Sequence, residues 1–215
     1  MPIKLYSLEA SPPVRAVWMI CEIYNIPLEL IDIELRTGDH LKPEFLKINP
    51  LHTVPAMDDD GTILHDSHAI LIYLSEMYGK DKSLYPKDPK GRALVNQKLF
   101  FNNAYLFPRM RNVTTPIFMG GRGVQQQHLE SIKEVYDFME TFLEKTKYLA
   151  GDNITIADIA AFPSVCGLMY IVPIDSARYP KITAWIKYFE SQPYSKKHNE
   201  KGAKMLGEIV QNGMK

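Results

Sequence analysis

Several features that would place this chain in a specialised class of protein are scarce or missing. Its 215 residues hold only two cysteines, Cys21 and Cys166, which stand far apart in apolar surroundings. We therefore expect buried, reduced thiols rather than a disulfide framework. No run approaches the ~20 apolar residues of a membrane span, and the first residues lack the apolar core of a secretory signal. These absences predict a cytoplasmic protein without a membrane segment.

An excess of one sign of charge is also missing. Lys+Arg and Asp+Glu number 25 each, and no run reaches five like charges. Nucleic acids and membrane surfaces are bound through basic excess, so we expect neither as a partner. With 46% hydrophobic and 23% charged residues, the composition is that of an ordinary globular protein. The length allows one large domain or two smaller ones.

A metal site is a further absence that the sequence predicts. Four of the six histidines lie in the first half: His40, His52, His65 and His68. Their spacings do not match a helical H-x-x-x-H, and no cysteine joins them. We therefore expect no structural or catalytic metal. His52, three residues before Pro55, is read as a side chain that binds a peptide, and His40 as a weaker candidate.

The first 80 residues alternate short apolar runs with helical patterns. The expected strands cover 3–8, 28–35, 54–57 and 62–65, and the expected helices cover 14–24, 43–48 and 67–78. The last two strands flank the turn Asp58-Asp59-Asp60-Gly61 and predict a hairpin. The order β-α-β-α-β-β-α indicates an α/β layer with a small mixed sheet.

The second half is predicted to be an all-helical bundle. Apolar residues step at helical intervals over 95–113, 129–143, 180–189 and 196–211, and Gly120 to Gly123 separates the first two helices. Thr155 and Asp158 form a capping box that begins a further helix. Pro108 should kink the first long helix. The polar, proline-containing stretch between the halves predicts a domain at 1–79, a linker at 80–90 and a second domain at 91–215.

The stretch from Asn49 to Ile70 carries the chemistry. A cis bond between Val54 and Pro55 would leave the Val54 backbone free to hold another chain, whereas a trans bond would place Pro55 on an edge strand. Asp66 and Ser67 begin an apolar helix, whose first N–H groups suit a ligand carboxylate, and Asp66 suits an ammonium group. Helix capping alone is the alternative for this pair.

Ser11 lies between the first strand and the first helix, where ligands bind in α/β sheets. It lacks the G-x-S-x-G context of a hydrolase nucleophile. Its hydroxyl is better suited to donate a hydrogen bond to an anion. A donor of that kind lowers the pKa of a thiol from ~8.5 and raises the thiolate fraction.

These motifs together resemble the cytosolic glutathione transferases. The resemblance rests on Ser11-Pro-Pro-Val-Arg15, Gly38 to Phe45, Asn49 to Pro55, Asp66 to Ile70 and Ile154 to Asp158, and it covers essentially the whole chain. It implies a thioredoxin-like α/β N-terminal domain followed by an all-α C-terminal bundle. Within the family the chain looks like the insect delta and epsilon classes, and Ser-Pro-Pro-Val-Arg is closer to epsilon.

The resemblance implies a role for each matching residue. Ser11 would stabilise the glutathione thiolate. Val54, before a cis Pro55, would pair with the cysteinyl backbone of glutathione. The other residues expected to bind glutathione are His40, His52, Thr53, Asp66, Ser67 and His68. Asp66 and His68 depart from the usual Glu and Arg, so we expect an affinity for glutathione that is retained but weaker and more dependent on pH.

The second substrate would occupy a pocket between Ser11 and the first helix of the bundle. The positions that match the family's pocket residues are Arg111, Thr115 and Met119, and the further candidates are Leu35, Phe107 and Met110. Two of the first three differ from the family's residues, and methionine repacks easily, so a less acidic and more adaptable pocket is expected.

The expected activity is conjugation of glutathione to hydrophobic electrophiles, in a symmetric homodimer. Dehydrochlorinase and glutathione peroxidase side activities are compatible with it. The alternative is a non-catalytic carrier of hydrophobic ligands on the same fold. A thiol-disulfide oxidoreductase would need a cysteine where Ser11 stands. Tyr6 is the rival activator, because other classes of the family use a tyrosine from the first strand.

Overall fold

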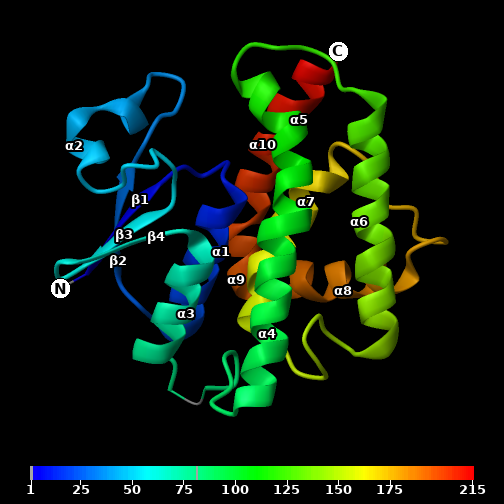
Figure 1. Cartoon of the computed structure of the whole chain (residues 1–215), viewed down its shortest axis with the longest axis horizontal. Helices are drawn as coiled ribbons and strands as arrows, with labels where there is room; N and C mark the ends of the chain where they lie inside the picture. Colours follow the sequence, from blue (N-terminus) through cyan, green and yellow to red (C-terminus); the bar gives the residue numbers. More distant parts are fainter. Residues whose placement is uncertain (1, 81) are drawn as a thin grey trace.

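A four-stranded mixed sheet forms the first part of the chain (Figure 1). The computed structural model describes residues 2–80 and 82–215. The strands are β1 (Ile3–Ser7), β2 (Leu28–Asp32), β3 (Ala56–Asp59) and β4 (Thr62–His65), in the spatial order β2-β1-β3-β4. β1 is parallel to β2 and antiparallel to β3, and β3 is antiparallel to β4. The predicted mixed sheet and hairpin are confirmed.

Helices cover both faces of this sheet. They are α1 (Pro12–Tyr24), the 3-10 turn η1 (Asp39–Leu41), α2 (Pro43–Leu46) and α3 (Ser67–Met77). Ile3 and Leu5 point from β1 into the core that α1 and α3 share. Tyr6 points the other way and packs edge-to-face on Phe45 of α2, with ring centroids 5.6 Å apart. Alternation along β1 thus assigns Tyr6 and Ser7 to opposite faces.

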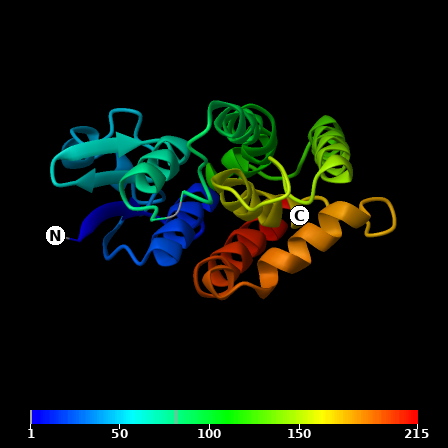
Figure 2. The ribbon, with the colours of Figure 1, turned by 90° about the horizontal axis from the view of Figure 1, so that it is seen from below.

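The second part is helical, as the sequence predicts. Its elements are α4 (Pro89–Phe101), the π-helical segment η2 (Asn102–Leu106), α5 (Phe107–Phe118), α6 (Gln126–Lys145), α7 (Ile156–Met169), α8 (Pro180–Ser191), α9 (Pro193–His198) and α10 (Glu200–Met214). Figure 2 shows α7 between α4 and α5 on one side and α8 to α10 on the other. The fold is therefore a thioredoxin-like domain joined to an all-α domain.

Several predicted limits differ from those of the structure. β2 ends at Asp32 rather than Leu35, and β3 begins at Ala56, so Val54 lies outside the strand. The predicted last helix is two helices, α9 and α10, which meet at Asn199. Instead of a simple proline kink, the wider turn of η2 directly precedes α5, with Pro108 in the first turn of that helix.

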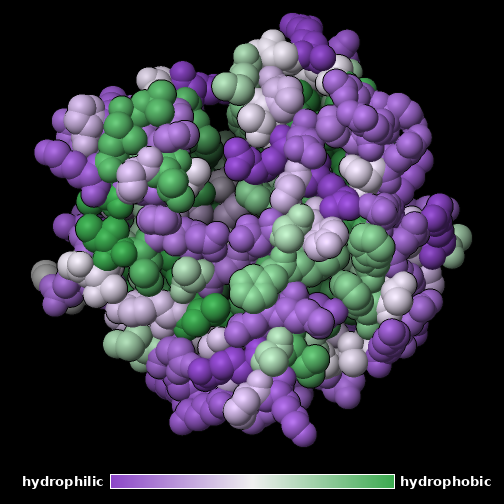
Figure 3. Space-filling view, viewed as in Figure 1, coloured by the Kyte–Doolittle hydropathy of each residue, from purple (hydrophilic) through white to green (hydrophobic). Residues whose placement is uncertain are grey.

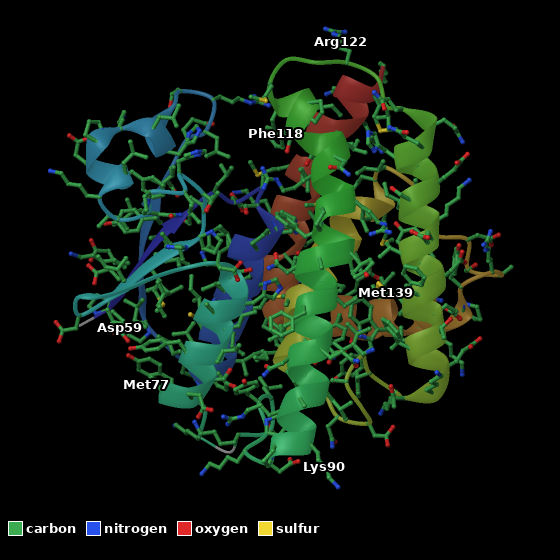
Figure 4. The ribbon with its side chains drawn as sticks, viewed as in Figure 1. Asp59, Met77, Lys90, Phe118, Arg122 and Met139 are labelled. Atoms are coloured by element: carbon green, nitrogen blue, oxygen red, sulfur yellow. The ribbon has the colours of Figure 1, made fainter. Side chains whose placement is uncertain are left out.

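One continuous core joins the two parts. Buried residues of β1, α1 and α3 belong to the same hydrophobic cluster as those of α4 to α10. Met139, labelled in Figure 4, points from α6 toward the other helices and is fully buried. The predicted capping box begins α7, where the Thr155 N–H donates to Asp158 over 3.0 Å. The domain limits 1–79 and 91–215 remain a proposal, and Asp81 of the proposed linker lies outside the described residues.

The described chain has neither a membrane-spanning helix nor a cluster of metal-binding side chains. Within residues 2–80 and 82–215, no helix combines the length and apolar character that crossing a membrane requires. The same ranges contain no group of three or more His, Cys, Asp or Glu side chains placed to hold a metal ion.

Candidate functional site

The predicted site residues of the first domain meet at one edge of the sheet. β1 and β2 are parallel, so the loop that holds Ser11 and the segment that holds His40 leave the same edge. β3 is antiparallel to β1 and begins at that edge, directly after Pro55. β4 ends there too and leads into Asp66. Segments far apart in the sequence thus form one surface, at the carboxyl ends of β1 and β2, where α/β sheets bind ligands.

Ser11 is the N-cap residue of α1, but its hydroxyl makes no capping hydrogen bond. Pro12 and Pro13 occupy the first two helical positions and have no N–H to offer, and the N–H of Val14 at the third position does not donate to the hydroxyl either. The Ser11 carbonyl is used, since the Arg15 N–H donates to it over 3.1 Å. The half-buried hydroxyl lies at the positive end of the helix, and within the described residues no hydrogen bond engages its oxygen or its proton.

Val54 offers an unpaired stretch of backbone. The Val54-Pro55 peptide bond is cis, as the resemblance implied. Within the described part of the chain, no hydrogen bond engages the Val54 N–H or C=O. An extended peptide could therefore pair with both groups, in the way that a strand adds to a sheet edge.

Asp66 and Ser67 have different roles at the start of α3. The Asp66 Oδ1 accepts from the His68 N–H over 2.8 Å and from the Ala69 N–H over 3.4 Å. The predicted capping is thus present, and Asp66 is held at φ 72°. Ser67 is only 7% exposed, and neither its N–H nor its hydroxyl has a partner among the residues described. These two donors are placed to receive a carboxylate.

His68 links this turn to the second domain, a contact that the sequence did not reveal. Its Nε2 lies 3.0 Å from the Asn102 amide nitrogen, and its Nδ1 lies 3.3 Å from the Asp66 Oδ1. The Asn102 amide nitrogen is a donor, so the Nε2 of His68 is placed to accept from it. The hydrogen bond with His68 holds the pKa of Asp66 below its usual value, so this carboxylate is ionised at neutral pH.

His40, His52 and Thr53 lie on the α2 side of the site. The two imidazole rings are 6.0 Å apart, and the buried Nδ1 of His40 has no partner within the described ranges. Thr53 differs, because its hydroxyl and carbonyl both accept from the Asn49 amide, over 3.0 and 2.8 Å. Thr53 thus helps to shape the loop before Val54, and the two histidines are the side chains left for a ligand.

The predicted pocket residues of the second domain lie mostly on one stripe of α5. Phe107, Arg111, Thr115 and Met119 are four residues apart, and Arg111 and Met119 are exposed. Figure 3 shows a hollow between the part of the first domain that carries α2 and the upper end of α5. Met110 is different: it is 2% exposed and packs on Gly167 of α7, inside the core. Leu35 packs in the small cluster around Phe45.

This arrangement can bind a small zwitterionic peptide beside an apolar molecule. The first domain offers a carboxylate, two donors at a helix start, an unpaired backbone and two imidazoles. The second domain faces them with apolar and basic side chains of α5. The Ser11 hydroxyl, at the same edge of the sheet, can donate to an anion.

Comparison with known proteins gives matches over most of the chain. The family model described as "Glutathione S-transferase, N-terminal domain" matches residues 5–82, and that described as "Glutathione S-transferase, C-terminal domain" matches residues 107–193. A relative from Manduca sexta, "Glutathione S-transferase 1", is 45% identical over 213 residues, which are 98% of each chain.

Solved structures agree in fold over nearly every residue. An epsilon-class glutathione S-transferase from the housefly, Musca domestica, is 42% identical, covers 98% of both chains and has a TM-score of 0.96. A glutathione transferase homologue from Drosophila mojavensis, solved with bound glutathione, is 38% identical, with a TM-score of 0.93. The match covers 99% of this chain and 97% of that one.

Proposed function

Because this chain belongs to the glutathione S-transferase family, we propose that it joins glutathione to hydrophobic electrophiles, with the Ser11 hydroxyl stabilising the thiolate. Family membership makes the chain a transferase of the insect epsilon and delta type. The single observation that carries the role of Ser11 is its uncommitted hydroxyl at the start of α1. A hydroxyl whose proton has no other acceptor can donate to a thiolate.

We infer that glutathione lies along the edge of the sheet that carries the site. The Val54 N–H and C=O would pair with the cysteinyl backbone. Asp66 would hold the γ-glutamyl ammonium, while the Ser67 N–H and hydroxyl would hold the γ-glutamyl carboxylate. His40 and His52 would hold the glycyl carboxylate. Support comes from the unpaired groups at these positions and from the related structure with bound glutathione.

The steps of the reaction follow from this placement. Binding brings the thiol beside the Ser11 hydroxyl and the positive end of α1, so the proton is lost more easily and the thiolate accumulates. An electrophile held against the α5 stripe is then attacked directly by sulfur, and the leaving group departs with its electron pair. Positioning of the two reactants and stabilisation of charge supply the catalysis, and no covalent bond to the enzyme forms.

A homodimer is part of the proposal. Family members are typically dimeric. The face of the molecule that carries α4 exposes large apolar side chains, including Phe100 at 70%, Met77 at 62% and Leu94 at 50%. Figure 3 shows hydrophobic atoms over the middle of α4 on this face. A second copy of the chain would remove that surface from water.

The activity is tested with the purified protein, glutathione and a panel of substrates. We expect conjugation of an activated aryl halide, and a panel of hydroperoxides and chlorinated hydrocarbons would reveal peroxidase and dehydrochlorinase side activities. The less acidic stripe of Arg111, Thr115 and Met119 favours apolar electrophiles. Turnover with none of the panel, together with tight binding of a hydrophobic dye, would instead establish the carrier function.

The Asp66→Asn variant tests the proposed contact with the ammonium group. Asparagine keeps an acceptor for the His68 and Ala69 N–H groups but loses the negative charge, so the KM for glutathione should rise about tenfold or more while kcat changes little and Tm falls modestly. The measurement is initial-rate kinetics at varied glutathione concentration.

Asp58→Asn is the matched control, because Asp58 also accepts a backbone N–H in a turn, from Gly61 over 2.8 Å, but lies away from the site. An unchanged KM in Asp66→Asn would refute the contact. The pH range matters here: the folded pKa of Asp66 is lowered, so its charge and the stability linked to it are present above the unfolded value of ~3.9. Both are lost only as the pH falls through the lowered folded pKa, so the assay belongs near neutrality.

A further inference from the structure

Arg15 is a fully buried cation without a carboxylate partner. Its exposed fraction is 0%, and its Nη1 donates to the backbone carbonyl of Asn199 over 3.2 Å and to the Asn199 side-chain oxygen. Its Nε and Nη2 have no partner within the described ranges. Glu9, an acid on the nearby loop, is paired with Lys201 over 2.7 Å. A buried charge with no counterion is costly, so its retention calls for a reason.

The position of Arg15 supplies that reason. Arg15 lies one helical turn after Ser11, and its backbone N–H donates to the Ser11 carbonyl over 3.1 Å. A Cβ added to Gly202 of α10 would lie 2.6 Å from the Arg15 Cδ and 2.2 Å from the Glu9 carbonyl oxygen. The Arg15 side chain and the loop before Ser11 therefore pack against the same residue of α10.

The charge of Arg15 persists in this interior. Burial lowers the pKa of Arg15 to about 10, so the guanidinium is still positive at neutral pH. Because the guanidinium is fully buried, its field is screened less than that of a surface arginine.

Asn199 holds this cation without neutralising it. It lies at the junction of α9 and α10, is 4% exposed, and its amide nitrogen donates to the Cys166 sulfur over 3.4 Å. The amide thus satisfies one neighbour with its oxygen and the other with its nitrogen. An aspartate has nearly the same shape but would form an ion pair with Arg15 and cancel its field.

We propose that the unpaired charge of Arg15 lowers the pKa of glutathione bound at Ser11, and that Asn199 is the positioning residue that keeps this charge in place and uncompensated. The inference deepens the proposed function, because it rests on a thiolate forming at Ser11. It assigns a catalytic purpose to the contact between the last helices of the second domain and the catalytic loop of the first.

The test measures the thiol pKa of glutathione bound to the Asn199→Asp variant. The ultraviolet absorbance of the thiolate, recorded across a range of pH, gives this pKa. The expected shift is upward, on the order of one pKa unit, with the KM for glutathione little changed. Asn153→Asp is the matched control, because it introduces the same charge at an exposed turn and should leave the thiol pKa unchanged.

Arg15→Met provides a second test that does not depend on the folding of the first variant. Loss of the cation should raise the thiol pKa by a similar amount. A lower Tm with an unchanged thiol pKa in either variant would show that Arg15 and Asn199 only join the domains, and would overturn the inference. The Ser11→Ala variant tests the proposed function separately. If this variant also leaves the thiol pKa unchanged, the role of Ser11 is wrong. If Ser11→Ala shifts the thiol pKa but Asn199→Asp and Arg15→Met do not, only the role of Arg15 is wrong.

Discussion

Replacing Ser11 with alanine is expected to lower kcat/KM for an aryl halide by about 10²-fold, with little loss of affinity for glutathione. The hydroxyl is proposed to donate to the thiolate, which forms as the reaction proceeds, whereas binding depends on the backbone of Val54 and the start of α3. The loss should therefore appear in the thiol pKa and in kcat. Steady-state kinetics and titration of the bound thiol measure the two effects.

The Ser11→Ala variant should change activity without changing stability. The Ser11 hydroxyl makes no capping bond, so its removal should leave Tm nearly unchanged. Thr155→Ala is the contrast, because the Thr155 hydroxyl accepts from the Ala157 N–H over 3.3 Å and its loss should cost about 1 kcal/mol. A drop in Tm without loss of turnover in Ser11→Ala would contradict the assignment.

Tyr6→Phe tests the rival activator. Tyr6 packs on Phe45, on the face of the sheet away from α1 and α3, so removal of its hydroxyl should leave turnover near normal. Normal turnover in Ser11→Ala combined with its loss in Tyr6→Phe would transfer the role to the tyrosine.

The largest loss of stability is expected from Asp158→Ala. This fully buried carboxylate accepts from the Leu149 N–H over 2.9 Å, the Trp185 Nε1–H over 3.0 Å, and both the N–H and the hydroxyl of Thr155 over 3.0 and 3.1 Å. Alanine would leave these donors buried without an acceptor, at a cost of about 3–5 kcal/mol. Urea unfolding followed by circular dichroism measures the change.

A control separates this effect from the general loss of a turn. Asp175 also accepts a backbone N–H, from Ala177 over 2.9 Å, but at an exposed position. Its replacement by alanine should change the free energy of unfolding by no more than about 1 kcal/mol. A loss in Asp158→Ala as small as that of the control would show that water replaces the carboxylate, and the hydrogen-bond argument would be wrong.

Local patterns in the sequence were sufficient to predict most of the fold. The alternation of β1, the prolines that begin α1 and the capping box of α7 act within a few residues, and each prediction from them is confirmed. β2 was predicted too long because Ile33 and Leu35 continue the alternation after the strand ends. Both side chains pack in the cluster around Phe45. The alternation of apolar and polar residues therefore continues into the loop, and this alternation alone does not distinguish a strand from a loop that covers a sheet.

The remaining errors come from contacts between distant residues. The break between α9 and α10 lies at Asn199, whose partners are Arg15 and Cys166, and nothing near Asn199 in the sequence announces them. The same is true of His68, whose neighbour Asn102 is 34 positions away. The sequence could predict the cis Pro55 and the capping residue Asp66, because those patterns are local. It could not predict which residues of the second domain contact them.

The π-helical segment η2 has a consequence for how the pocket could change in evolution. A π turn accommodates one residue more than an α-helical turn, and each residue rotates a helix by about 100°. Deletion of one residue between Asn102 and Leu106 could restore a regular helix from α4 through α5. Because the wide turn already absorbs the extra residue, Arg111 and Thr115 would keep the face that they turn to the hollow, and only the side chains of η2 would shift. The chain can therefore gain or lose one residue at η2 without changing the row of side chains on α5, so a change in that row requires substitutions.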